Sequence, residues 1–62
     1  MLPNLDAEQA RTRKSDDVVA KMLNISRETY VRKKKTLNFK FREIIALCDY
    51  FHKDFDYLFA TE

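Results

Sequence analysis

The sequence contains no glycine, and its only proline is Pro3. These two residues are the usual breakers of helices, so the chain favours helices joined by short turns of Asn, Ser or His. Apolar residues recur at helical spacing, and no segment requires a strand. The sequence therefore predicts an all-α fold, a compact bundle of about five short helices.

A chain of 62 residues is too short for two independent cores, because a domain of this size hides only about 60% of its unfolded surface. We expect one domain over residues 1–62. The lone Cys48 and the lone His52 exclude an internal disulfide and a zinc site built from Cys and His alone. We expect no metal and no cofactor, and stabilisation by a partner chain stays open.

The sequence predicts a soluble cytoplasmic protein. A lone thiol suits a reducing compartment, and no apolar stretch approaches the roughly 20 residues that span a bilayer. The first residues also lack the basic start and the apolar run of a signal peptide.

Charge is strongly segregated along the chain. Residues 27–42 carry seven Lys or Arg against Glu28 alone, a net +6, whereas residues 43–62 carry −4 and residues 1–26 carry zero. Such a run is commonly a solvated helix face, but it also occurs on surfaces that bind nucleic acid. Charge alone leaves both interpretations open.

Capping residues predict where the first three helices begin and end. Asn4 can begin a helix over about residues 5–13, and Ser15 a second one that ends near residue 23. Asn24 suits the left-handed exit from that helix. Ser26 can then cap a third helix over residues 27–35.

Two further helices are predicted after a polar link over residues 36–40. The fourth is the most amphipathic, and the fifth begins at Asp54. Apolar residues at helical spacing are expected to face the core: Phe41, Ile44, Ile45, Leu47, Cys48, Phe51, Phe55, Leu58 and Phe59.

Residues 16–35 have the spacing of two helices that cross at a steep angle over a short turn. Such a pair needs a small residue at the contact, a turn former at the bend and flanking apolar residues. We expect these from Val19, Ala20, Leu23, Asn24 and Ile25, with Tyr30 also in the core.

The segment DDVVAKMLNISRETYVRKKK, residues 16–35, resembles the helix-turn-helix of the lambda-repressor and Cro-like (XRE-type) family. Residues 41–59, which end in DYLF, resemble that family's closing helices, so the resemblance covers nearly the whole chain. LPNL at residues 2–5, with Thr29-Tyr30 and the lysines at 33–35, is similar to short phage-borne members from Gram-positive hosts. The resemblance implies a transcriptional regulator, a repressor or Cro-like protein, that binds double-stranded DNA.

The resemblance also implies contacts, because in this family the second helix of the motif enters the major groove. The implied base-reading residues are Ser26, Arg27, Glu28, Val31 and Arg32. The implied phosphate-binding residues are Lys33, Lys34, Lys35, Lys40 and Arg42. Arginine suits guanine, glutamate accepts from cytosine, and valine contacts a thymine methyl group.

Some of these residues have simpler explanations. Glu28 and Arg32 stand four residues apart and can pair on a solvated helix face. Arg27 can anchor a phosphate instead of a base. Lys33 stands where an apolar residue is common, so its stem can pack inward while its ammonium group reaches solvent.

Several residues depart from the family's pattern. Asp16 replaces a common phosphate-binding Gln, Asp6 replaces a basic residue, and Arg13 and Lys14 replace a glycine and an aliphatic residue. A carboxylate is repelled by the DNA backbone. These aspartates support a rival hypothesis, a protein-interaction module that binds another regulatory protein without reading DNA. The lysine run favours DNA.

The C-terminal region suggests a partner surface more than a catalytic site. Its aromatic residues predict a homodimer interface or a docking surface for a regulatory protein, which Tyr50, Tyr57 and Phe59 could supply where they reach the surface. Cys48 and His52 could meet, but so small a bundle leaves little room for a catalytic cleft. We therefore expect no enzyme.

Overall fold

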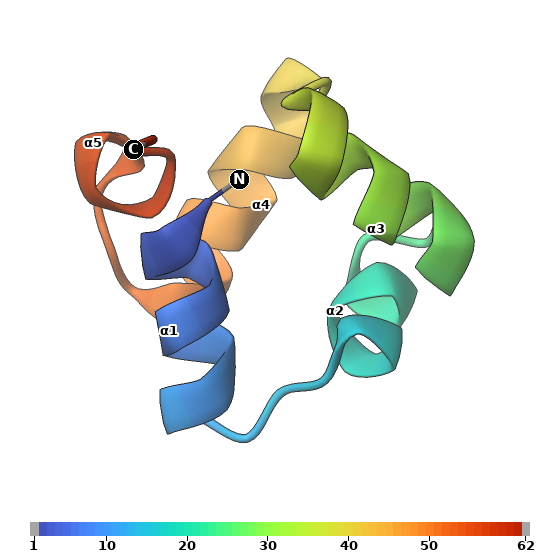
Figure 1. Ribbon diagram of the computed structural model, residues 1–62, viewed down its shortest axis with the longest axis horizontal. Coiled ribbons are helices and arrows are strands. Elements are labelled where there is room, and N and C mark those ends of the chain that lie inside the picture. The colour runs from blue at the N-terminus through green and yellow to red at the C-terminus, as the bar shows by residue number, and fades with distance from the viewer. Residues whose placement is uncertain (1, 62) are drawn as a thin grey trace.

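The computed structural model describes residues 2–61, which form five helices and no strand (Figure 1). The helices are α1 (Pro3–Arg11), α2 (Asp16–Met22), α3 (Arg27–Thr36), α4 (Phe41–Phe51) and α5 (Phe55–Leu58). The predicted all-α class with about five helices is confirmed. The bounds of the first four helices lie within two residues of those expected from the sequence.

The helices form a bundle with principal dimensions of 24 × 23 × 19 Å. Figure 1 shows α2 and α3 on one side and α5 on the opposite side, with α1 and α4 between them. α2 packs against α3, and α5 packs against both α1 and α4. Within the described residues, none of the helices has the length and apolar character needed to cross a membrane.

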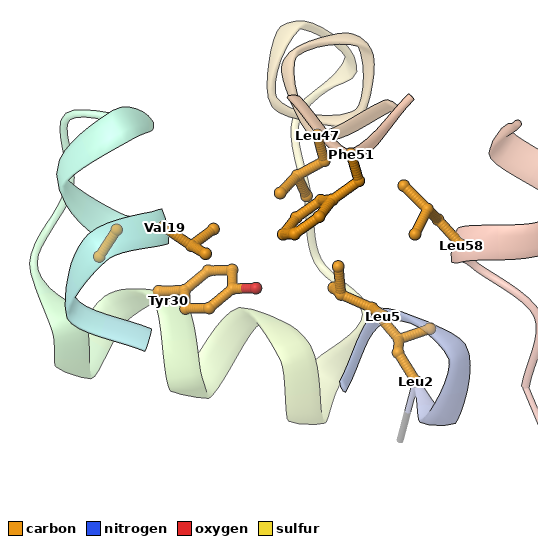
Figure 2. Close-up of a cluster of buried hydrophobic side chains, with 8 residues drawn as sticks. Leu2, Leu5, Val19, Tyr30, Leu47, Phe51 and Leu58 are labelled. Atoms are coloured by element: carbon orange, nitrogen blue, oxygen red, sulfur yellow. The ribbon is translucent and has the colours of Figure 1, made fainter. Parts of the chain in front are cut away.

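All five helices or their caps contribute buried side chains to one core (Figure 2). Tyr30 is completely buried, as predicted, and lies beside Val19. The buried apolar residues are Leu2, Leu5, Val19, Ala20, Tyr30, Leu47, Phe51 and Leu58. Half-buried side chains, among them Leu23, Ile25 and Phe59, pack around them. The core therefore joins the two sides of the bundle.

Two of the four predicted helix caps form as expected. The hydroxyl of Ser15 accepts a hydrogen bond from the Val18 N–H at 3.4 Å, and the hydroxyl of Ser26 accepts one from the Thr29 N–H at 3.1 Å. Both bonds satisfy a backbone donor that the first helical turn leaves free.

Of the other two predicted caps, Asn4 is wrong, and Asp54 stands at the expected N-cap position of α5 but lacks the side-chain hydrogen bond. Asn4 lies inside α1, because proline suits the first helical position and α1 therefore starts at Pro3. The Asn4 side chain instead donates a hydrogen bond to the Tyr57 carbonyl at 2.9 Å. Asn4 thus fastens α1 to α5.

Among residues 2–61, the backbone is left-handed at four positions, none of which is a glycine. Asn24 (φ 61°) and His52 (φ 55°) are residue types that the sequence suggested for turns, and Arg13 (φ 57°) and Leu37 (φ 58°) are not. This conformation costs a residue with a Cβ atom roughly 1–2 kcal/mol. The surrounding fold must therefore hold Arg13 and Leu37 in place.

Three apolar residues expected in the core are exposed instead. The exposed fractions are 77% for Phe41, 47% for Ile45 and 52% for Phe55. The buried side of α4 is centred on Leu47 and Phe51, which places Phe41 and Ile45 on the far side of the helix. Helical spacing grouped these residues correctly, but it did not show how the helix is rotated about its axis.

Candidate nucleic-acid interface

A short connection over residues 23–26 fixes α3 relative to α2. The Ile25 N–H donates to the Ala20 carbonyl at 3.0 Å, and Asn24 adopts the left-handed conformation between them. Ser26 then starts α3. Val19 and Ala20 are buried where the two helices pack. The residues expected to build this helix pair therefore lie together at its contact and its turn.

Tyr30 anchors the inner face of α3. Its hydroxyl donates to Gln9 Oε1 of α1 at 2.6 Å, and its ring packs edge-on against Phe39 with 6.2 Å between ring centroids. Burial raises the pKa of the Tyr30 hydroxyl, and the nearby carboxylates of Asp16 and Asp6 raise it further. The hydroxyl therefore remains a neutral donor that ties α3 to α1.

Lys34 lies at the centre of an ion cluster. Its Nζ atom is 2.8 Å from Asp6 Oδ1 and 2.9 Å from Asp16 Oδ1, and it donates to Gln9 Oε1 at 3.3 Å. The ammonium group also lies 5.0 Å from the centre of the Tyr30 ring. The Lys34 cluster, formed by these five residues, connects α1, α2 and α3.

A phosphate-binding lysine needs an exposed ammonium group, but only 12% of the Lys34 side chain is accessible. Burial would lower the pKa of Lys34, but its hydrogen bonds to Asp6 and Asp16 and their negative charges raise it. Burial would likewise raise the pKa of Asp16, but hydrogen bonds from Gln9 and Lys34 lower it. Lys34 and Asp16 are therefore held in their charged forms.

Lys33 is also directed inward, where it joins α3 to α4. Its Nζ atom lies 3.0 Å from Glu43 Oε1, and only 15% of its side chain is exposed. Burial would raise the pKa of Glu43, but hydrogen bonds from the Lys40 N–H, at 2.8 Å, and from Lys33 lower it. The Lys33 ammonium group therefore forms an ion pair within the protein, with the carboxylate of Glu43.

The outer face of α3 gathers the residues predicted to read bases. Ser26, Arg27, Glu28 and Arg32 are exposed, and Val31 is half-buried. A shallow groove is lined by Asp16, Arg27, Glu28, Val31, Arg32, Lys35 and Thr36. The face combines cations, a carboxylate and apolar surface, the chemical groups that can distinguish base edges.

Ion pairing on this outer face is weak. Arg27 Nε lies 3.7 Å from Asp17 Oδ1, and both side chains are mostly exposed. Among residues 2–61, Glu28 and Arg32 form no ion pair with each other. The alternative that these two residues simply pair along the helix is therefore not supported.

A second cationic area adjoins the α2–α3 connection at the start of α4. Lys40 and Arg42 are exposed and line a hollow together with Asn24 and Thr29. Neither cation has a carboxylate partner within 4 Å among residues 2–61, and the same is true of Arg32 and Lys35. Among the five residues predicted to bind phosphate, three have side-chain charges without an ion-pair partner: Lys35, Lys40 and Arg42. The charges of Lys33 and Lys34 are paired with carboxylates of the protein.

Comparison with known protein families, with curated proteins and with solved structures gives no match to this chain. The fold and the site define a small all-helical protein in which one helix is fastened on its inner face and presents a cationic outer face.

Proposed function

We propose that α2 and α3 form a helix-turn-helix and that the protein binds double-stranded DNA in a sequence-specific manner as a regulator of transcription. α3 enters the major groove, where Arg27, Glu28 and Arg32 contact base edges. Lys35, Lys40 and Arg42 contact the phosphates on either side. Lys33 and Lys34 hold the reading helix in place and do not contact DNA.

One observation carries this proposal: the outer face of α3 is accessible and cationic while its inner face is fixed. Tyr30, Lys33 and Lys34 tie the inner face to three other helices. A base-reading helix needs such support, because side chains that contact base edges must be held in a defined position. The free cations on the outer side supply the attraction for phosphate.

The Lys34 cluster also weakens the case for a protein-interaction module that does not read DNA. Asp6 and Asp16 support that rival because carboxylates repel phosphates. In the fold, both carboxylates contact the Lys34 ammonium group at 2.8–2.9 Å. Lys34 therefore balances one of the two negative charges within the protein, which reduces the repulsion of DNA that these carboxylates would otherwise cause.

The properties of Cys48 do not favour catalysis. Burial and the negative charges of Asp49 and Asp54 raise the pKa of the Cys48 thiol. A nucleophilic cysteine needs the opposite shift, because the thiolate is the reactive form.

Selection from a random double-stranded DNA library tests the proposal, followed by fluorescence anisotropy on the selected duplex and on a shuffled duplex. We expect one enriched sequence that binds at least about 10³-fold more tightly than the shuffled DNA. Arg32→Ala should reduce binding to the selected duplex. Lys53→Ala is the matched control, because Lys53 is an exposed cation in the link between α4 and α5.

No enrichment, together with equal binding to both duplexes, would contradict sequence-specific recognition. If the chain bound neither duplex at low salt, where phosphate contacts are strongest, DNA binding of any kind would be excluded. The interaction-module hypothesis would then replace the proposal.

A further inference from the structure

An apolar groove lies between α4 and α5. It is lined by Phe41, Ile44, Ile45, Cys48, Asp49 and Phe55. Phe41, Ile45 and Phe55 are among the most exposed large apolar side chains of the described residues. In a chain this small, three such side chains around one groove indicate a surface that binds a partner.

The aromatic residues expected to form a partner surface already have contacts within the fold, although Tyr57 is exposed as expected. Tyr50 is half-buried and packs edge-on against Phe51, and Phe59 packs between Phe39 and Phe55. The Tyr57 hydroxyl donates to Glu8 Oε2 at 3.2 Å. The unpartnered apolar surface is therefore centred on α4 and not on the C-terminal tyrosines.

The outward side of α4 has a regular order of charges. Phe41, Arg42, Ile45 and Asp49 are exposed, and Leu47 is buried on the opposite side. Arg42 precedes Ile45 by three residues, and Asp49 follows it by four. The exposed stripe therefore begins with a cation, has an apolar centre and ends with an anion.

We propose that this face binds a second copy of the chain, with α4 antiparallel to α4 of the partner and the two-fold axis beside Ile45. Reversing the helix about Ile45 brings Arg42 level with the partner's Asp49 to within one residue, a rise of about 1.5 Å. The same operation places Phe41 level with the partner's Asp49 and one residue from the partner's Cys48, where it enters the groove beside the partner's Phe55.

A second copy fits this face because the face is complementary to itself. The antiparallel arrangement pairs Arg42 with Asp49 twice, whereas a parallel arrangement would place like charges side by side. A standard interface needs roughly 800 Å² from each partner, and the whole chain exposes 4316 Å². The proposed contact consists of one helix face and one groove, so we expect a weak, concentration-dependent dimer. In this dimer Arg42 pairs with the partner's Asp49, so the phosphate contacts of the proposed function fall to Lys35 and Lys40. The dimer itself does not depend on the proposed DNA binding.

Charge reversals test the proposal by sedimentation equilibrium without DNA. Arg42→Asp gives a face with two acids, and Asp49→Arg gives a face with two bases. Each variant alone should dissociate about tenfold more readily than the parent, because both pairs become repulsive. Mixed in equal amounts, the two variants should form a heterodimer of parental strength. The double variant should dimerise like the parent.

These substitutions spare the fold, because an acid near the start of α4 and a base near its end both suit the helix dipole. Circular dichroism checks that both variants remain helical. Lys21→Asp, an exposed reversal on α2, is the control and should leave dimerisation unchanged.

Two results would overturn the proposal. One is a parent chain that stays monomeric at every concentration, in which case the groove accepts a different partner. The other is a parent dimer that both single reversals leave intact, because the two copies would then meet through another surface.

Discussion

The inner and outer faces of α3 carry the same residue type in opposite surroundings. Lys33 and Lys34 face inward, have side chains only 15% and 12% exposed, and contact carboxylates of the same fold. Lys35 is exposed and has no carboxylate within 4 Å among residues 2–61. Neighbouring lysines therefore stabilise the fold in two cases and remain free for a ligand in the third.

The difference shows that a count of charges in a sequence overstates the charge offered to a partner. Residues 27–42 carry a net +6. Two of their seven cations are balanced by Glu43, Asp6 and Asp16, which lie outside this segment. The basic surface is therefore smaller than the sequence indicates, and it is confined to the outer side of α3 and the start of α4.

Removal of the Lys34 ammonium group should have the largest effect on stability, because it removes the ion pairs that distinguish the inner face of α3 from its outer face. Lys34→Met keeps most of the stem but leaves Asp6 and Asp16 without their cation, so we expect a loss of about 2–3 kcal/mol in the free energy of unfolding. Urea denaturation measures this loss. Lys35→Met is the matched control and should change stability by less than about 0.5 kcal/mol. Equal effects of the two substitutions would contradict the assigned difference between the faces.

Arg27 tests the outer face. Arg27→Ala should weaken binding to the preferred DNA by about 1–3 kcal/mol and reduce discrimination at one base pair. Anisotropy titrations on the preferred duplex and its single-base variants measure both effects, after circular dichroism has checked the fold. A uniform loss on every sequence would instead identify Arg27 as a phosphate anchor.

Acid should reduce the stability of the fold by protonating Asp16, which then loses its ion pair with Lys34 on the inner face of α3. The pKa of Asp16 is lowered from its ordinary value of 3.8, so its stabilisation is complete above that value and is lost as pH falls through the lower pKa of the folded state. Asp16→Asn should cost about 1 kcal/mol at neutral pH and should make stability less sensitive to pH below about 4. Urea denaturation at a series of pH values measures this.

Asp17→Asn is the control for the acid experiment, because the Asp17 side chain is 74% exposed and only loosely paired with Arg27. It should leave the pH profile close to that of the parent. If Asp16→Asn also left the profile unchanged, the Lys34 cluster would not contribute to acid sensitivity.

The smallest expected effect is at Lys35. Lys35→Ala should weaken binding to all DNA sequences alike and should lower the slope of log affinity against log salt by about one unit, because one phosphate contact is lost. Titrations at several salt concentrations measure the slope. Lys34→Met provides the comparison and should leave the slope unchanged, so a reduced slope in that variant would show that Lys34 contacts phosphate.

Local signals in the sequence predicted the helices well. Ser15 and Ser26 mark helix starts, and Asn24 marks a helix end, because each of these effects acts within a few residues. Periodicity likewise placed Tyr30 in the core. The residues of the outer face of α3 followed from the same helical geometry together with the family resemblance.

Contacts between distant segments could not be predicted in this way. Lys34 meets Asp6 and Asp16 across separations of 28 and 18 residues, and no periodic pattern links those positions. Asp6 and Asp16 suggested poor DNA binding only because the sequence does not show that Lys34 is their partner within the fold. Phe41 and Ile45 were misplaced for a related reason, since periodicity does not determine which side of α4 the rest of the bundle covers.

The end of α3 depends on residues that come later in the chain. Leucine favours helix and resists the left-handed conformation that Leu37 adopts, so the local sequence does not stop α3 there. Phe39 lies just beyond this bend, and its ring packs edge-on against Phe59, 5.5 Å away between centroids. During synthesis on a ribosome, this contact between Phe39 and Phe59 can form only after Phe59 has emerged. A chain truncated before Phe59 lacks this support for the bend after α3.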